Sequence, residues 1–191
     1  MGIKKGDKQA KSFETRKLIV STANKLFLEK GFKNTTSALI AQAAEISPGL
    51  FYFYFKDKTS LFTNWLNSLL ETCHDYLYNQ FKLKDYNVET TLIAANIIEK
   101  LSETIFSSPA FFEDGDAGFK NMINMFLSKL EHIFISSCFD ASINLPTPEL
   151  SAYLIINLIR DYSKQIKNSH LNKESLLHKY ALLITTLIET K

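Results

Sequence analysis

The stretch from Arg16 to Phe62, RKLIVSTANKLFLEKGFKNTTSALIAQAAEISPGLFYFYFKDKTSLF, decides the fold of this chain. It begins with apolar residues at helical spacing and then reaches Gly31, a residue that readily takes the left-handed conformation in which many helices end. Phe32 follows as the apolar residue that often packs just beyond such an end. This part of the stretch therefore predicts a helix that stops at Gly31.

Two short helices are predicted next. Thr35 or Thr36 can cap the first, whose apolar face lies within residues 39–43. Ser47 can cap the second, which has Pro48 at its first position, where the missing N–H costs nothing. Two short helices joined by a few residues form a helix-turn-helix, whose second helix lies in the DNA major groove. Donors placed for phosphates at the helix N-termini are Thr35, Thr36, Ser47 and the backbone of Gly49.

A longer pattern runs through the same stretch without a gap. Its members are Phe27, Gly31, Phe32, Thr35, Thr36, Ile40, Ala41, Ala44, Ile46, Ser47, Gly49, Tyr52, Tyr54, Phe55, Lys58 and Leu61. This pattern resembles the N-terminal domain of TetR-family transcriptional regulators and covers about a quarter of the chain. The resemblance implies a DNA-binding domain followed by a helical domain that binds a ligand and dimerises.

The resemblance also implies which residues touch DNA. Phosphates would be contacted by Tyr52, Tyr54 and Lys58. The first short helix would be seated on the DNA backbone by Thr35 and Thr36. The residues that face the groove would be Pro48, Gly49, Leu50 and Phe53. Phe51 and Phe55, four residues apart, are expected in the core instead.

Several residues depart from the family pattern. The turn usually has glycine where this chain has Glu45, so a strained backbone is expected there. Ala38, Leu39 and Leu50 stand where the family often has a basic residue, an acidic residue and threonine. The helix PGLFYFYF lacks Arg, Asn and Gln, which make bidentate contacts to bases. Base reading is therefore expected to use thymine methyl groups and DNA shape.

Composition and charge agree with a DNA-binding head on a folded chain. The 191 residues are 46% hydrophobic and 22% charged, which is typical of globular proteins. The net charge of +2 conceals an asymmetry: residues 1–62 hold 11 Lys or Arg against 5 Asp or Glu, and residues 63–191 hold 11 against 15. A basic part favours phosphate contacts, although a basic face without a partner is the alternative.

The sequence favours a cytoplasmic location and gives no sign of catalysis. Cys73 and Cys138 lie in apolar helical patterns and are expected to be reduced core thiols. No signal core is present, and no apolar run approaches the ~18 residues of a membrane span. The four histidines show no metal spacing, and no catalytic triad or phosphate loop is recognisable. We expect no metal, no cofactor and no enzyme activity.

The whole chain is predicted to be all-α, with three regions. Residues 1–12 are predicted to form a flexible basic arm, which could track phosphates or merely be solubilising. Residues 13–56 are predicted to form the helix-turn-helix domain, and residues 57–191 the helical domain. A long helix capped by Asp57 is expected to link head and body. Helices are predicted around residues 92–105, 119–134, 147–159 and 173–188.

The last two predicted helices suggest a homodimer. Residues 150–159 are apolar almost all round, and such a helix must be covered on every side. The final helix is also rich in apolar residues. Packing of both helices against a second copy would form an isologous four-helix interface. Such a dimer would present two recognition helices, about 34–36 Å apart, to the two half-sites of a palindromic site. A thicker monomeric core is the alternative.

Bulky apolar residues in the body suggest a ligand pocket. Those expected to line it are Trp65, Phe106, Phe112, Met122 and Phe126. Such side chains can surround a small, largely apolar effector, although they more often fill a core. The sequence thus predicts a ligand-responsive repressor of transcription. Two rivals remain: an apolar-ligand carrier that has lost DNA affinity, and a small enzyme on a helical bundle.

Overall fold

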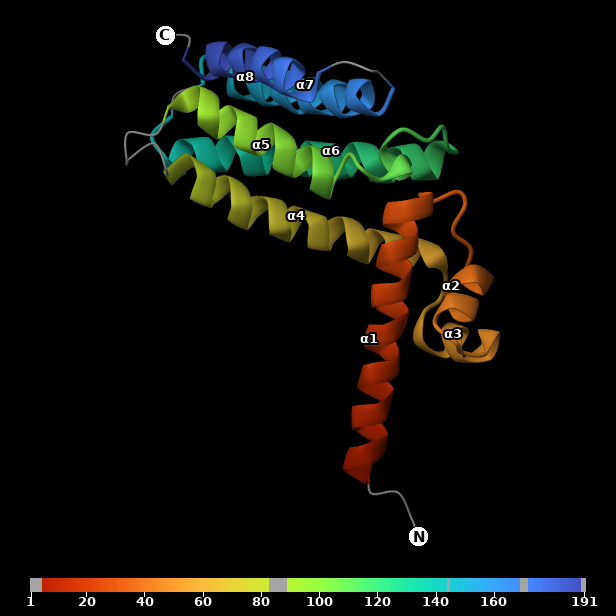
Figure 1. The fold of residues 1–191 in the computed structure, drawn as a ribbon. Coiled ribbons are helices and arrows are strands. Elements are labelled where there is room, and N and C mark those ends of the chain that lie inside the picture. Colours follow the sequence, from red (N-terminus) through yellow and green to blue (C-terminus); the bar gives the residue numbers. More distant parts are fainter. Residues whose placement is uncertain (1–4, 83–88, 144, 169–171, 190–191) are drawn as a thin grey trace. The chain divides into compact units, whose positions relative to one another are not determined.

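The computed structural model describes residues 5–82, 89–143, 145–168 and 172–189, and these form only helices, turns and loops (Figure 1). The predicted all-α fold is thereby confirmed. The elements are α1 (Lys5–Lys30), α2 (Ser37–Ala43), α3 (Pro48–Tyr54), α4 (Lys58–Lys82), α5 (Thr90–Thr104), the 3-10 turn η2 (Pro109–Phe111), α6 (Ala117–Asp140), α7 (Pro148–Asn168) and α8 (Lys173–Glu189). The sequence has a polar break at residues 82–87, KLKDYN, most of which lie outside the described residues.

Local side-chain signals set most of these helix boundaries. Gly31 has φ 76°, the left-handed value expected after α1. The N–H of Ser60 donates to Asp57 Oδ1 at 2.8 Å, so Asp57 begins α4 as predicted. The N–H of Phe119 donates to Asp116 Oδ1 at 2.8 Å and starts α6 in the same way.

Two helices end with a residue that is strained for an L side chain. After α2, Glu45 has φ 54°, its N–H donates to the Gln42 carbonyl, and the Ile46 N–H donates to the Ala41 carbonyl. This pair of bonds is the Schellman motif, in which the left-handed position usually holds glycine. Ser142 has the same φ of 54° after α6. The strain expected at Glu45 is therefore present in the backbone.

The chain forms two compact units. The head unit comprises residues 1–66 and 108–115, and the body unit comprises residues 67–107 and 116–191. Both units are interrupted along the chain, whereas the domains predicted from the sequence (1–12, 13–56 and 57–191) are contiguous. That domain division stays a prediction.

The N-terminal segment differs from the expected arm. Helix α1 begins at Lys5, so residues 5–12 continue the helix that carries the head core instead of forming a separate segment. Helix propagation explains this, because each added residue gains a backbone hydrogen bond once the helix is nucleated. Residues 1–4 lie outside the described part.

The body unit is a layered bundle. Helix α5 packs on α7 and α8, and α7 also packs on α6 and α8. These four helices run alongside one another in Figure 1. Tyr180 of α8 donates to the Asp161 carboxylate of α7. Burial and this hydrogen bond raise the pKa of Tyr180 to about 12. Cys73 and Cys138 are buried free thiols, and burial raises the pKa of Cys73 to about 12.

Helices α7 and α8 bury one side and expose apolar residues on another. The buried side of α7 includes Ile155 and Ile159, while Tyr153 and Leu154 are exposed. On α8, Leu183 is 52% exposed. No described helix is long and apolar enough to cross a membrane.

Candidate nucleic-acid interface

Helix α3 is anchored in the head unit by its aromatic inner side. Phe51 is fully buried and its ring lies 6.2 Å from that of Phe55, which is also buried. The Arg16 guanidinium lies over the Phe55 ring at 5.4 Å. The core positions predicted for Phe51 and Phe55 are confirmed, and this anchoring fixes which side of α3 faces outward.

The outward side of α3 carries apolar and aromatic residues. Tyr52 is 59% exposed, Phe53 is 75% exposed and Leu50 lies at the edge of the exposed range. At the start of the helix Ser47, Pro48 and Gly49 are also exposed. We name this set the exposed α3 face: Ser47, Pro48, Gly49, Leu50, Tyr52 and Phe53. All six are accessible, and their contacts with DNA stay a prediction.

The two short helices have capped N-termini. The N–H of Leu39 donates to Thr36 Oγ1 at 3.0 Å, and the N–H of Leu50 donates to Ser47 Oγ at 3.2 Å. A Cβ added to Gly49 would meet nothing within 4 Å, so packing does not require glycine there. Both helix starts therefore present an open backbone, which suits an approaching phosphate.

Thr35 is placed differently from Thr36. Its side chain is fully buried, and Thr35 Oγ1 donates to the Gly31 carbonyl at 2.7 Å. A second carbonyl, that of Leu26, lies 3.3 Å away. The hydroxyl thus closes the end of α1, and a DNA contact by Thr35 stays a prediction. Thr36, which is exposed, is the member of the pair that can contact DNA.

Lys58 likewise points into its own unit. Its Nζ donates to the carbonyls of Phe32 and Thr35 at 2.7 Å each and lies 4.0 Å from the centre of the Phe32 ring. Burial lowers the pKa of Lys58, and the nearby Glu113 carboxylate opposes that shift. In this geometry the ammonium holds the α1–α2 loop, and the phosphate contact of Lys58 stays a prediction.

Tyr54 links α3 to α1. Its hydroxyl donates to Ser12 Oγ at 3.1 Å in a partly buried position. The ring also packs edge-on against Phe53, with centroids 5.0 Å apart. Tyr54 can reach a phosphate only by exchanging this bond, whereas Tyr52 on the same helix is exposed.

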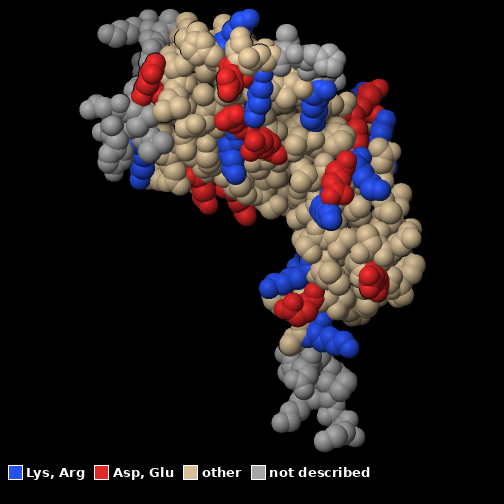
Figure 2. Space-filling model, viewed as in Figure 1, with Lys and Arg blue, Asp and Glu red and all other residues tan. Residues whose placement is uncertain are grey.

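Charge around the interface comes from residues that flank α3. Lys56, directly after the helix, and Lys33, in the α1–α2 loop, are both exposed. Glu45, between α2 and α3, is exposed as well and adds a negative charge. Figure 2 shows that basic and acidic side chains are interspersed on the visible face. Exposure and position next to α3 identify Lys56 as a phosphate-contact candidate that the motif pattern did not single out.

A distant segment completes the head unit. Ser108 Oγ donates to the Phe27 carbonyl at 2.7 Å, and Glu113 Oε2 accepts from the Lys33 N–H at 3.0 Å. Phe111 is buried and its ring lies 6.2 Å from that of Trp65. The sequence predicts either a loop or one short helical piece for residues 110–118, and nothing local signals contacts with residues about eighty positions away.

The residues expected to line an apolar pocket are divided between the units. Trp65 belongs to the head, where its ring lies 5.8 Å from Phe27 and 5.4 Å from Phe62. Phe112 is in the head and half-buried; Phe106, Met122 and Phe126 are in the body, with Phe106 and Phe126 buried. Trp65 thus fills the head core. An apolar pocket formed by this set stays a prediction.

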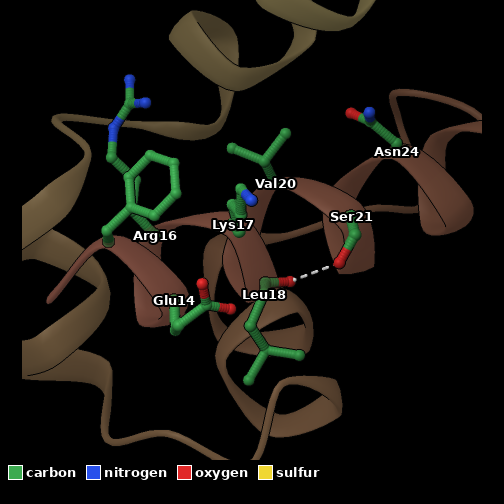
Figure 3. A pocket seen from close by; sticks show the side chains of 8 residues that line it. Glu14, Arg16, Lys17, Leu18, Val20, Ser21 and Asn24 are labelled. Carbon is green, nitrogen blue, oxygen red and sulfur yellow. Dashed lines mark hydrogen bonds between the residues drawn. The ribbon is translucent and has the colours of Figure 1, made fainter. Parts of the chain in front are cut away.

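Pockets are present elsewhere among the described residues. One, of about 680 Å³, is an open hollow lined by residues of α1 alone, from Phe13 to Asn24. Figure 3 shows its side chains diverging from a single helix, with Ser21 Oγ bonded back to the Leu18 carbonyl. It therefore lacks convergent polar groups. A smaller pocket, of about 150 Å³, lies in the body unit and is lined by residues of α5, α7 and the start of α8. The described residues contain no group of three or more metal-ligating side chains.

These features define a class: an all-α protein with an N-terminal helix-turn-helix that exposes one side of its second helix. The family described as "Bacterial regulatory proteins, tetR family" matches residues 19–64. The regulator YhgD of Bacillus subtilis is 28% identical over 86% of this chain and 92% of its own. The regulator YuxN of the same organism is 35% identical over 45% of this chain, which spans only 31% of YuxN.

The solved structures agree with the sequence comparisons. A TetR-family transcriptional regulator from Mesorhizobium loti superposes with a TM-score of 0.67 at 18% identity, covering 91% of this chain and 94% of that one. At this identity the likeness concerns the fold. The family match over residues 19–64 and the curated relatives support a TetR-family transcriptional regulator, and the solved structure agrees with them in fold.

Proposed function

We propose that the protein is a ligand-responsive repressor that acts in the cytoplasm and binds a palindromic operator as a homodimer. The observation that supports DNA binding most directly is the exposed α3 face. Large apolar and aromatic side chains are left in water on a helix whose other side is firmly buried. A contiguous exposed apolar surface of this kind marks an interaction site.

The chemistry of this face suggests how it reads DNA. Leu50 and Phe53 can contact thymine methyl groups, and Tyr52 can donate a hydrogen bond to a phosphate. Thr36 and Ser47 hold open helix starts for phosphates, and Lys56 supplies a charge beside them. Sequence preference would then come from methyl contacts and DNA shape, with affinity largely from the phosphates.

Dimerisation is proposed through α7 and α8. Both helices expose leucine or tyrosine side chains beside a buried side that already serves the body core. A second copy would cover these residues in an isologous interface, as many two-fold dimers do. Two copies of α3 would then meet successive major-groove half-sites about 34–36 Å apart. Occupancy of such a site would block transcription.

Regulation would require a ligand with unequal affinity for the two states. We propose a small, largely apolar effector held by the body, with α4 as the mechanical link, because α4 begins in the head unit and ends in the body unit. An effector that binds the non-DNA state about a hundredfold more tightly would supply roughly 2.7 kcal/mol of coupling.

The test measures binding of the purified protein to DNA duplexes from its own upstream region. Fluorescence anisotropy gives the affinity at each salt concentration of a series. A regulator should give a sequence-dependent complex whose affinity falls steeply with salt. Tyr52→Ala should weaken all duplexes alike, whereas Leu50→Ala should change the preference at one base step. Equal effects of both on every sequence would contradict the groove assignment.

One observation keeps a second function in view. The exposed α3 face has no cation or amide, and Glu45 adds a negative charge next to it. An apolar-ligand carrier with little DNA affinity would show these features too. It would bind all duplexes weakly and without preference in the same experiment.

A further inference from the structure

The exposed α3 face offers DNA only two kinds of side-chain group. Leu50 and Phe53 are purely apolar, and both are exposed. The polar side chains of the face belong to Ser47 and Tyr52, and both end in a hydroxyl. The face therefore presents apolar carbon and hydroxyl groups, and its side chains contain neither a charge nor an amide.

The exposed rings of this face are held by their neighbours. The Tyr52 ring packs edge-on against buried Phe51, with centroids 5.2 Å apart. The Phe53 ring packs edge-on against Tyr54 at 5.0 Å, and the Tyr54 hydroxyl donates to Ser12 Oγ at 3.1 Å. Edge-on ring pairs contribute stability beyond the area they bury. Both rings are thus presented to a partner in defined positions.

The hydroxyls of this face do not distinguish donors from acceptors on a base. A hydroxyl donates one hydrogen bond and has two lone pairs that accept. Ser47 Oγ accepts from the Leu50 N–H at 3.2 Å and keeps a proton and a second lone pair for other partners. In the major groove thymine presents the O4 acceptor and cytosine the N4–H₂ donor, and a hydroxyl suits either. The group at position 4 of a pyrimidine is therefore not tested by this face.

The apolar side chains of the face detect a different feature of a pyrimidine. Thymine carries a methyl group at C5, and cytosine does not. Contact with Leu50 or Phe53 removes this methyl group from water, which is favourable. A 5-methylcytosine base carries the same methyl group at the same ring position. A face that tests the methyl group and not position 4 treats the two bases alike.

Side chains that can discriminate at position 4 lie outside α3. The exposed amide of Gln42 belongs to α2, which in this motif crosses the DNA backbone. Glu45 lies in the turn between α2 and α3, and Lys56 follows the end of α3. Recognition by the groove-facing side of α3 itself is thus left to methyl contacts.

We propose that the exposed α3 face recognises the C5 methyl group of a pyrimidine and accepts 5-methylcytosine in place of thymine. Replacing a contacted T·A pair by C·G would then weaken binding, and methylation of that cytosine would restore it. Cytosine methylation would therefore create binding sites that the unmodified sequence lacks. This inference rests on the proposed binding of DNA by α3 and adds the chemical group that is read.

Single-base replacements in a bound duplex test the proposal. The probe is the duplex that the purified full chain enriches from a random-sequence pool, with affinity measured by fluorescence anisotropy at one salt concentration. Each T·A pair is replaced in turn by deoxyuridine·A, by C·G and by 5-methylcytosine·G. At contacted positions deoxyuridine should weaken binding about fourfold for each methyl group removed, and C·G at least as much. The 5-methylcytosine duplex should bind within about twofold of the thymine duplex.

A double variant and a control assign the effect to α3. Leu50→Ala with Phe53→Ala removes exposed apolar surface, so the fold should persist, and the deoxyuridine penalty should fall below about twofold. The control is Leu92→Ala, at an exposed position on α5 in the body unit, and it should keep the fourfold penalty. An unchanged penalty in the double variant would place the effect in DNA shape and overturn the proposal.

The methyl reading and the proposed function fail in different ways. If the pool yields no preferred duplex, both fail. A preferred duplex that binds equally well with deoxyuridine at every position overturns the methyl reading alone. So does a 5-methylcytosine duplex that binds as weakly as the cytosine duplex at every contacted position. In both of these cases sequence-dependent DNA binding, and with it the proposed function, still stands.

Discussion

Glu45 combines two costs in one residue. Its φ of 54° strains an L side chain, and its carboxylate is exposed between α2 and α3. We predict that Glu45→Gly stabilises the protein by about 0.5–1 kcal/mol, because about 1–2 kcal/mol of strain is relieved and part is offset by the entropy of glycine in the unfolded chain. Urea unfolding measures this change.

Matched variants separate backbone strain from charge. Ser142→Gly relieves the same φ at the end of α6 in the body and should stabilise to a similar extent without changing DNA affinity. Glu45→Gln keeps the strain but removes the charge, so it should raise DNA affinity and leave stability unchanged. A Glu45→Gly variant that is less stable than the parent would contradict the strain argument.

Lys56 and Lys58 should behave in opposite ways although they are two residues apart. Lys58→Met removes two hydrogen bonds to the Phe32 and Thr35 carbonyls and should cost about 1–2 kcal/mol of stability. Lys56→Met should cost little stability but weaken binding to all duplexes and reduce the salt slope by about 1. Denaturant unfolding and salt-dependent anisotropy on both variants provide the comparison. The reverse pattern would assign Lys58 to the phosphates.

Residues with local signals were predictable, and those with distant partners were not. Gly31, Ser47, Asp57 and the Phe51–Phe55 spacing act within a few residues, so the sequence pattern identified their roles. The side chain of Lys58, by contrast, reaches carbonyls 26 and 23 positions away, and the family pattern alone cannot show this. The pocket of the body unit was not predictable for the same reason, because α5, α7 and the start of α8 bring its lining together from separate stretches.

At the scale of elements, the segment 108–115 acts as a brace for the α1–α2 loop. Glu113→Ala removes the acceptor for the Lys33 N–H, and we expect the head to lose about 1–2 kcal/mol of stability. The pKa of Lys58 should also fall further in this variant, because the Glu113 charge of the parent protein opposes the lowering caused by burial. Urea unfolding and NMR titration of the lysine ammonium measure the two effects.

Glu29→Ala is the control for this element. Glu29 is exposed in the same unit and pairs with Lys25 only at 3.9 Å, so its removal should change stability by less than about 0.5 kcal/mol. If Glu113→Ala changed neither stability nor the pKa of Lys58, the segment would not be bracing the loop.

At the scale of the whole molecule, the exposed apolar residues of α7 and α8 should decide the oligomeric state. Leu183→Glu places a charge in the proposed interface and should weaken the dimer at least about a hundredfold, because an unpaired charge would be buried. Met125→Glu, at an equally exposed position on α6, should leave it intact. Sedimentation velocity over a concentration series distinguishes the two. A monomeric parent would refute the interface.

The split of the head along the chain limits how evolution and engineering can recombine this protein. Residues 108–115 belong with residues 1–66 although 41 residues of the other unit come between them, as the intervening range 67–107 shows. A hybrid gene with a single junction near residue 66 would therefore combine the α1–α2 loop of this protein with the segment of another protein that corresponds to residues 108–115. Functional chimaeras should need three junctions, one inside α4 and one on each side of residues 108–115, exchanged together.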